Sequence, residues 1–170
     1  PLVHARLGIA QENSGKLVHL VRQKAKELAE KKRLDVTIND GPPGIGCAVI
    51  SSLSGASLAC IVTEPSLSGI HDMERVLQVC RHFSIPTQVV VNKFDINEDG
   101  TRQIEAYCAT QEIEVVARIP FDTKVTEAQV EGVSIVEYTD EPRLVGPVYQ
   151  AWDAELGVAA MTIWRDLRLL

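Results

Sequence analysis

The sequence predicts an α/β fold, in which a parallel β-sheet is covered by helices on both faces. Short apolar runs alternate with amphipathic segments between residues 36 and 118, and this alternation is typical of right-handed β-α-β crossovers. Clusters of Gly, Pro, Asn and Asp follow the apolar runs. Because ligands bind at the carboxyl ends of the strands in such folds, these clusters are the candidate functional loops.

The individual elements follow from hydrophobic periodicity and residue type. Loose alternation and β-branched or apolar runs predict strands, which cover residues 2–7, 36–39, 58–63, 88–92 and 114–118. Apolar residues at three- and four-residue steps predict helices; the first follows a Ser14 N-cap and runs to about residue 32, and the others cover about residues 47–53, 69–83 and 98–110. Residues 1–140 are expected to form the main domain, and residues 141–170 a C-terminal helical extension.

The extension carries a continuous apolar stripe that begins after Pro147. Its members recur at helical spacing and are Val148, Trp152, Leu156, Ala159, Ile163, Trp164, Leu167 and Leu170. We expect the stripe to pack on the sheet or against a second subunit, because the neighbouring Asp153 and Glu155 oppose an anionic membrane surface. The alternative is an amphipathic helix that lies on a membrane.

Composition limits the function classes. A net charge of -6 and a pI near 5.2 in 170 residues argue against a nucleic-acid binder that relies on a basic surface. No apolar run approaches the ~20 residues that a membrane span needs. The cysteines are widely spaced without a C-x-x-C pattern, which predicts reduced thiols in a cytoplasmic protein rather than a metal site; they are Cys47, Cys60, Cys80 and Cys108.

The centre of the sequence is residues 35–47, where a β-branched run ends in Asp40 and a Gly- and Pro-rich turn begins with Gly41 and includes Gly44. The glycines let a backbone pass close to a ligand. An acid at the carboxyl end of a strand is placed to hold a hydrated Mg²⁺ or to orient a water molecule beside a phosphate. The alternative is a turn in which the Asp caps a helix.

Lys16 stands at the start of the first predicted helix, after Gly15. The pattern fails to match the phosphate-binding loop, because Leu17 replaces the hydroxyl residue that binds Mg²⁺. Lys16 can still meet an anion at the helix N-terminus; the alternative is a solvated lysine.

The motif Asn92-Lys93-Phe94-Asp95 follows an apolar strand. N-K-x-D is the base-reading motif of GTPases, in which the Asp carboxylate accepts two hydrogen bonds from guanine. A GTP-binding protein is therefore an open alternative, and so is a turn that only ends the strand.

The ordered set of motifs resembles the MinD/ParA/Mrp ATPases, in particular a branch with a ferredoxin domain inserted after its early strands. The resemblance covers about Leu2 to Tyr138 and rests on residues 13–18, 40–47, 63–72, 91–97 and 119–122. It implies a P-loop NTPase fold of the deviant Walker A type that works as a nucleotide-dependent homodimer.

The resemblance also implies roles for individual residues. Asp40 matches the switch acid that supports Mg²⁺ and the attacking water, and Asn92 matches the asparagine that hydrogen-bonds adenine. The loop that closes over the base and ribose matches Pro120, Phe121 and Asp122. An ordinary GTPase has a serine–alanine–lysine motif at that point. The complete expected nucleotide-binding set is Gly41, Gly44, Asn92, Lys93, Asp95, Pro120, Phe121 and Asp122.

Two features of the family are not found in these residues: the phosphate loop with its two lysines, and the cysteines of the [4Fe–4S] clusters. The chain opens on Pro1, and we expect it to be the carboxyl-terminal part of a longer ATPase that acts with an iron–sulfur or electron-transfer partner. ATP and Mg²⁺ are the expected cofactors, with clusters only in the inserted domain. Alone, the chain is expected to bind nucleotide weakly and to hydrolyse essentially none. The remaining alternative is a non-catalytic, partner-binding scaffold.

Overall fold

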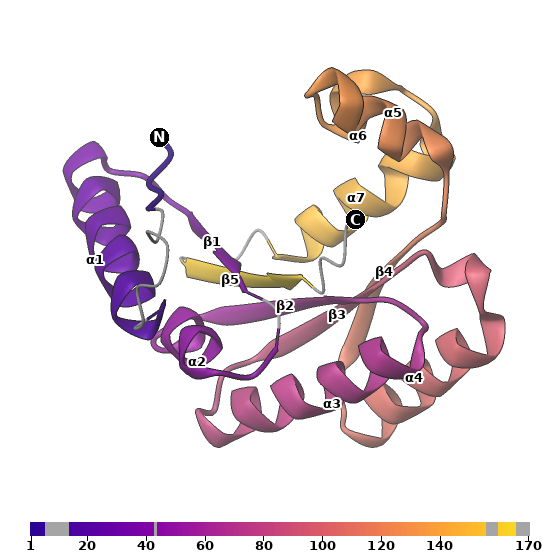
Figure 1. The fold of residues 1–170 in the computed structure, drawn as a ribbon, viewed down its shortest axis with the longest axis horizontal. Helices are drawn as coiled ribbons and strands as arrows, with labels where there is room; N and C mark the ends of the chain where they lie inside the picture. Colours follow the sequence, from indigo (N-terminus) through magenta and orange to yellow (C-terminus); the bar gives the residue numbers. More distant parts are fainter. Residues whose placement is uncertain (6–13, 43, 156–159, 166–170) are drawn as a thin grey trace. The chain divides into compact units, whose positions relative to one another are not determined.

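The computed structural model describes residues 1–5, 14–42, 44–155 and 160–165 (Figure 1). These residues form two compact units. One unit is drawn from Pro1–Ile61, Asp72–Thr87 and Val158–Leu170, and the other from Val62–His71 and Gln88–Gly157. The chain passes between the units within β2 (Leu58–Thr63), within α3 (Leu67–His82) and at the start of β3 (Thr87–Asn92).

The first unit is built on parallel strands in the order β1-β5-β2. Its further elements are α1 (Ser14–Lys32), β1 (Thr37–Gly41), α2 (Cys47–Leu53) and β5 (Ala160–Arg165). β1 and β5 run parallel in a continuous register from Thr37 opposite Ala160 to Gly41 opposite Trp164. Its buried apolar side chains include Val49, Leu53, Leu58, Ala59, Cys60, Ile61, Met73, Val76, Leu77 and Cys80.

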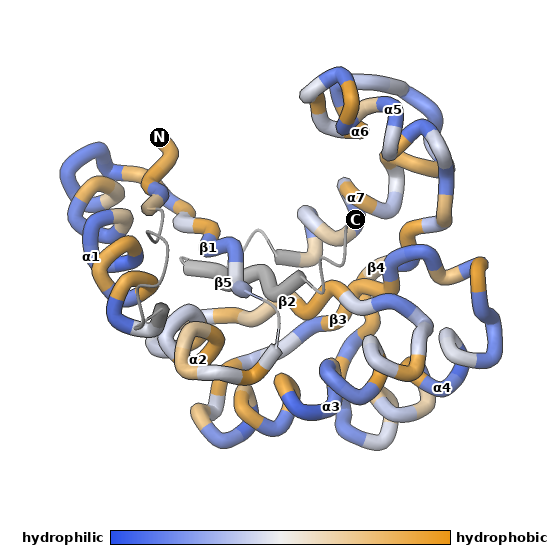
Figure 2. Tube along the Cα trace, in the orientation of Figure 1, coloured by the Kyte–Doolittle hydropathy of each residue, from blue (hydrophilic) through white to orange (hydrophobic). Residues whose placement is uncertain are grey.

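Helix α1 packs on α2. A Cβ atom on Gly15 would lie 3.2 Å from Cβ of Cys47, so the amino ends of the two helices meet closely. The Arg22 guanidinium donates to the carbonyls of Ser51, at 2.8 Å, and Ser54, and so satisfies acceptors at the carboxyl end of α2. Partial burial lowers the pKa of Arg22. The mixed hydropathy of α1 in Figure 2 fits a helix with one packed face.

The second unit is built on β3 and β4 (Glu114–Ile119), which run parallel with one irregularity between Val89 and Val90. Its further elements are η1 (Phe94–Ile96), α4 (Glu98–Thr110), α5 (Thr123–Glu131), α6 (Ile135–Tyr138) and α7 (Pro142–Glu155). Helices α4 and α7 both pack on β4, from opposite sides (Figure 1). The buried apolar side chains include Val89, Val90, Val91, Ile104, Cys108, Val116, Ala117, Ala128 and Leu144.

The predicted parallel α/β fold is confirmed, and most elements lie within two residues of their predicted bounds. Two differences stand out. Residues 2–5 form no strand, and the remainder of the segment predicted at 2–7 lies outside the described residues. The C-terminal helix predicted as a single extension is α7 up to Glu155, whereas Ala160–Arg165 pairs with β1 as β5. Leu156, Ala159, Leu167 and Leu170 of the predicted stripe lie outside the described residues.

All four cysteines are free thiols, with Cys60, Cys80 and Cys108 buried and Cys47 exposed. Burial, together with the nearby charge of Glu105, raises the pKa of the Cys108 thiol to about 11, which keeps it protonated at neutral pH. Among the described residues, no helix is both long enough and apolar enough to cross a membrane.

Candidate functional site

The carboxyl ends of β3 and β4 lie side by side, because Asn92 is in register with Ile119. Asn92 is the last residue of β3 and is half-buried. Its side-chain amide has no hydrogen-bond partner among the described residues, so both its donor and its acceptor are available to a ligand.

Lys93 turns the chain sharply after β3. Its backbone is left-handed, with φ of 53° and ψ of 41°, a conformation that costs a non-glycine residue about 1 kcal/mol or more. The Lys93 ammonium lies 2.7 Å from a carboxylate oxygen of Glu64, and the two side chains are only 24% and 26% exposed. This ion pair joins the loop after β3 to the loop after β2.

Asn97 makes a second contact, a hydrogen bond, between the same two loops. Its Oδ1 accepts from the backbone N–H of Gly100 at 3.0 Å and caps α4, while its Nδ2 donates to the carbonyl of Pro65 at 2.8 Å. The approach is so close that a Cβ atom on Gly100 would lie 2.6 Å from that carbonyl oxygen. Gly69 is similar, since its Cβ would lie 2.4 Å from the carbonyl oxygen of Glu64.

We therefore expect Gly100→Ala to destabilise the protein by about 1–3 kcal/mol, because the added methyl group collides with backbone rather than with a flexible side chain. Urea denaturation measures the effect. Gly146→Ala is the matched control, since a Cβ there meets nothing within 4 Å and alanine is the better helix former by roughly 1 kcal/mol. Equal stability of the Gly100 variant and the wild type would contradict the close approach.

Asp95 is exposed and contacts the loop that follows β4. Its Oδ1 accepts a hydrogen bond of 2.7 Å from the backbone N–H of Phe121. Pro120 is buried, whereas the Phe121 side chain is 50% exposed. The structure therefore brings Asn92, Asp95 and the 120–122 loop together, and it uses one Asp95 oxygen to hold that loop.

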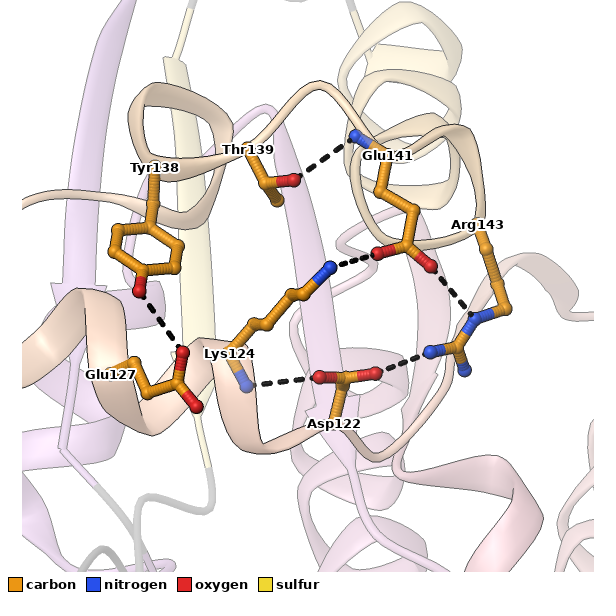
Figure 3. A network of polar contacts seen from close by, with 7 residues as sticks. All are labelled: Asp122, Lys124, Glu127, Tyr138, Thr139, Glu141 and Arg143. Carbon is orange, nitrogen blue, oxygen red and sulfur yellow. Dashed lines mark hydrogen bonds and ion pairs between the residues drawn. The ribbon is translucent and has the colours of Figure 1, made fainter.

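Asp122 ends this loop within a network of charged side chains (Figure 3). Its Oδ1 accepts from the backbone N–H of Lys124 at 2.9 Å, which caps α5, and its Oδ2 pairs with Arg143 of α7. The Lys124 ammonium lies 2.5 Å from Glu141. The Lys124 amide, with Arg143 adding to the effect, holds the pKa of the Asp122 carboxyl below its usual value. Asp122 is therefore ionised at neutral pH.

Asp40, Gly41, Gly44 and Lys16 belong to the other unit. Asp40 is the exposed penultimate residue of β1, and its carboxylate has no hydrogen-bond or ion-pair partner among the described residues. Gly41 is buried. Gly44 has φ of +86° with nothing within 4 Å of a Cβ position, so the turn before α2 needs a residue that tolerates left-handed backbone.

Lys16 is exposed in the first turn of α1, the end at which α1 meets α2. The amino ends of both helices thus lie close together in the unit, and a helix amino end in general favours an anion. The anion-binding role of Lys16 stays a prediction.

The chemical types of the side chains at these strand ends determine which metal ions or ligands the residues can bind. One exposed carboxylate at a strand end suits Mg²⁺ bound through water, because Mg²⁺ keeps several of its waters in such sites. The open amide of Asn92 beside the 120–122 loop suits a nucleotide base. Among the described residues, no three or more His, Cys, Asp or Glu side chains are grouped so that they could hold a metal ion.

Two residues of the site were not predicted as site residues, Asn97 and Arg143, whereas Glu64 lies in the segment 63–72 on which the resemblance rests. Asn97 directly precedes a helix with acidic residues in its first turn, and that pattern is an N-cap signal. No local signal marks Arg143 or the ion pair of Glu64 with Lys93, because the partners of both pairs are distant in the sequence.

Comparison with known proteins gives related sequences of limited coverage. No protein-family model matches the chain. An uncharacterised protein of Methanocaldococcus jannaschii is 32% identical over 97 residues, which are 57% of this chain and 34% of that protein. An iron-sulfur cluster carrier protein of Pyrococcus horikoshii is 29% identical over 123 residues, which are 64% of this chain and 41% of that protein. The chain spans less than half the length of these curated relatives.

Solved structures share the fold. The MinD cell division protein of Aquifex aeolicus aligns with a TM-score of 0.65 at 22% identity, over 84% of this chain and 61% of that one. The septum site-determining protein MinD of Pyrococcus horikoshii, complexed with Mg-ADP, aligns with a TM-score of 0.58 at 22% identity, over 68% and 48%. The sequence relatives, which include an ATP-binding protein of Methanocaldococcus jannaschii, and the shared α/β fold support a MinD/ParA/Mrp-type P-loop ATPase superfamily for this chain.

Proposed function

We propose that this chain is the base-binding, carboxyl-terminal portion of an ATP-binding and ATP-hydrolysing protein that acts with an iron–sulfur ferredoxin module. The observation that carries the proposal is the pairing of an open amide, Asn92, with a loop already held in place, residues 120–122, at the carboxyl ends of two parallel strands. This edge is where α/β folds bind their ligands.

Each residue has a defined task in the proposal. The Asn92 amide donates to and accepts from the adenine edge, and the 120–122 loop covers the base and ribose. The backbone of Gly41 and Gly44 allows phosphates to approach the end of β1, and Asp40 orients the attacking water. Mg²⁺, when bound, neutralises charge on the phosphate oxygens. The phosphate loop is proposed to come from a segment outside these 170 residues.

Adenine is favoured over guanine by the contacts of Asp95. A carboxylate that reads guanine must direct both oxygens at the base, but Oδ1 of Asp95 accepts the Phe121 amide proton. Lys93 is likewise occupied, since it pairs with Glu64. The N-K-x-D residues therefore support the adjoining loops in this proposal, with Asn92 alone contacting the base.

The proposed partners follow from the relatives. The similarity to an iron-sulfur cluster carrier protein supports a role beside iron–sulfur proteins. We propose that ATP binding assembles a homodimer and that hydrolysis resets it, gating cluster or electron transfer. No nucleic acid takes part, because the net charge of -6 opposes a phosphate backbone.

Calorimetric titration and a phosphate-release assay test the proposal. The full-length gene product is expected to bind ATP in the presence of Mg²⁺ and to hydrolyse it, whereas the 170-residue chain alone is expected to bind weakly without turnover. GTP is expected to compete no better than ATP. The proposal would be overturned if the full-length protein bound neither nucleotide. If it clearly preferred GTP, the proposed substrate would be GTP instead of ATP.

A further inference from the structure

The amino end of α7 contacts the loop that follows β4. Arg143 of α7 pairs with Oδ2 of Asp122, and Oδ1 of the same carboxylate caps α5 through the Lys124 amide. The Asp122 side chain is only 17% exposed, while that of Arg143 is 52% exposed. Both oxygens of a sheltered carboxylate are thus engaged, which fixes its orientation.

A second ion pair reinforces the first. Glu141 lies 2.5 Å from the Lys124 ammonium and 3.6 Å from Nε of Arg143, so one carboxylate joins the cations of α5 and α7 (Figure 3). The two carboxylates of this network, Asp122 and Glu141, and its two cations, Lys124 and Arg143, together carry no net charge. A network of this kind holds its geometry better than a single exposed pair, because each side chain is restrained by more than one partner.

We propose that Arg143 is a positioning residue for nucleotide binding: by holding Asp122, it keeps the 120–122 loop in the shape that receives the base and ribose. This role rests on the proposed ATP-binding function. The loop is held from two sides, by Asp95 at the Phe121 amide and by Arg143 at Asp122. A loop that is ordered before the ligand arrives spares the ligand the entropic cost of ordering it.

The cap that Asp122 forms on α5 would not by itself hold the 120–122 loop in position relative to β4. The Asp122–Lys124 contact lies within the first turn of α5 and moves with that helix. Arg143, in contrast, is 21 positions away and lies on a helix that packs on β4, the strand from which the loop departs. The arginine therefore ties the far end of the loop back to the strand at its near end.

The test compares Arg143→Gln and Arg143→Lys with the wild type in the full-length gene product. We expect Arg143→Gln to weaken ATP binding about 5- to 30-fold, as for losing the order of roughly one residue, with kcat at saturating ATP unchanged. Arg143→Lys should restore part of the affinity. Arg102→Gln is the matched control, because Arg102 is an exposed arginine of the same unit whose ion-pair partners among the described residues are Glu98 and Asp99 on its own helix.

Two further measurements separate positioning from general stability. Hydrogen exchange at the Phe121 and Lys124 amides should quicken in Arg143→Gln, while amides of the buried strand β3 stay protected. Combining Arg143→Gln with Asp122→Asn should weaken ATP binding no further than Asp122→Asn alone, because each change disrupts the same Arg143–Asp122 ion pair.

The outcomes are distinct. If the wild type binds ATP and Arg143→Gln binds it equally well, Arg143 has no positioning role while the proposed function stands. The positioning role is also excluded if the two changes add, or if exchange quickens throughout the unit, since Arg143 would then act on overall stability. A wild-type protein that does not bind ATP overturns the proposed function and this role with it.

Discussion

Replacement of Asp40 by Asn is expected to lower ATP turnover of the full-length protein by ~10²-fold or more while ATP binding is retained. The exchange keeps the shape of the side chain but removes the negative charge at the end of β1, beside the proposed position of the metal and the attacking water. A loss of this size corresponds to about 2.7 kcal/mol of transition-state stabilisation. Phosphate release at saturating ATP measures turnover, and calorimetric titration measures binding.

Asp35→Asn is the matched control for this experiment. Asp35 is an exposed acid that precedes β1, so it lies at the opposite end of the strand from Asp40. We expect its replacement to leave turnover unchanged. Unchanged turnover in Asp40→Asn would instead make Asp40 a residue of the turn alone, and the catalytic acid of the proposed site would have to be sought elsewhere.

Local sequence patterns were sufficient for most of the fold. The predicted bounds of β2, α2 and α4 are those of the structure, because each segment combines a clear periodicity with Gly, Pro or Asn at its ends. The tail shows the limit of such reasoning. Ala160–Arg165 fits a helical stripe, yet it forms a strand beside β1, since pairing with a distant segment outweighs local periodicity.

The candidate site, like the fold, was predictable from the sequence only in part. Asn92 and the 120–122 loop were each predicted at the carboxyl end of a strand, and the register of Asn92 with Ile119 shows that these two strand ends are neighbours. The side-chain ties could not be predicted, because Glu64 to Lys93 and Pro65 to Asn97 join loops about 30 residues apart. An N-cap pattern predicts the local hydrogen bond of Asn97 but carries no information on its second partner.

These ties change how the N-K-x-D motif is interpreted. From sequence alone, Asp95 could read a guanine base or support an ATPase loop. In the structure its Oδ1 holds the Phe121 amide, and Lys93 holds Glu64. Both side chains connect neighbouring loops, so we expect their loss to loosen the site for any nucleotide rather than to change which base is chosen.

The second large effect is expected on ATP affinity, when the residue proposed to contact the base is replaced. Asn92→Ala is expected to weaken ATP binding by roughly 1–3 kcal/mol, because the adenine groups that the amide satisfies would be left without a partner. That range corresponds to about 5- to 150-fold in Kd. Gln103→Ala removes an exposed amide from α4 of the same unit and is expected to leave binding unchanged.

Asp95→Ala distinguishes a supporting residue from a base-reading residue. Since it frees the Phe121 amide and loosens the 120–122 loop, we expect it to weaken ATP and GTP binding by the same factor, with their ratio unchanged. A carboxylate that accepted hydrogen bonds from guanine would give a different result: the variant would lose GTP binding and keep ATP binding. Competition titrations with both nucleotides measure the ratio directly. A preference for GTP that disappears in Asp95→Ala would establish a GTP-binding protein and exclude Asn92 as an adenine-specific contact.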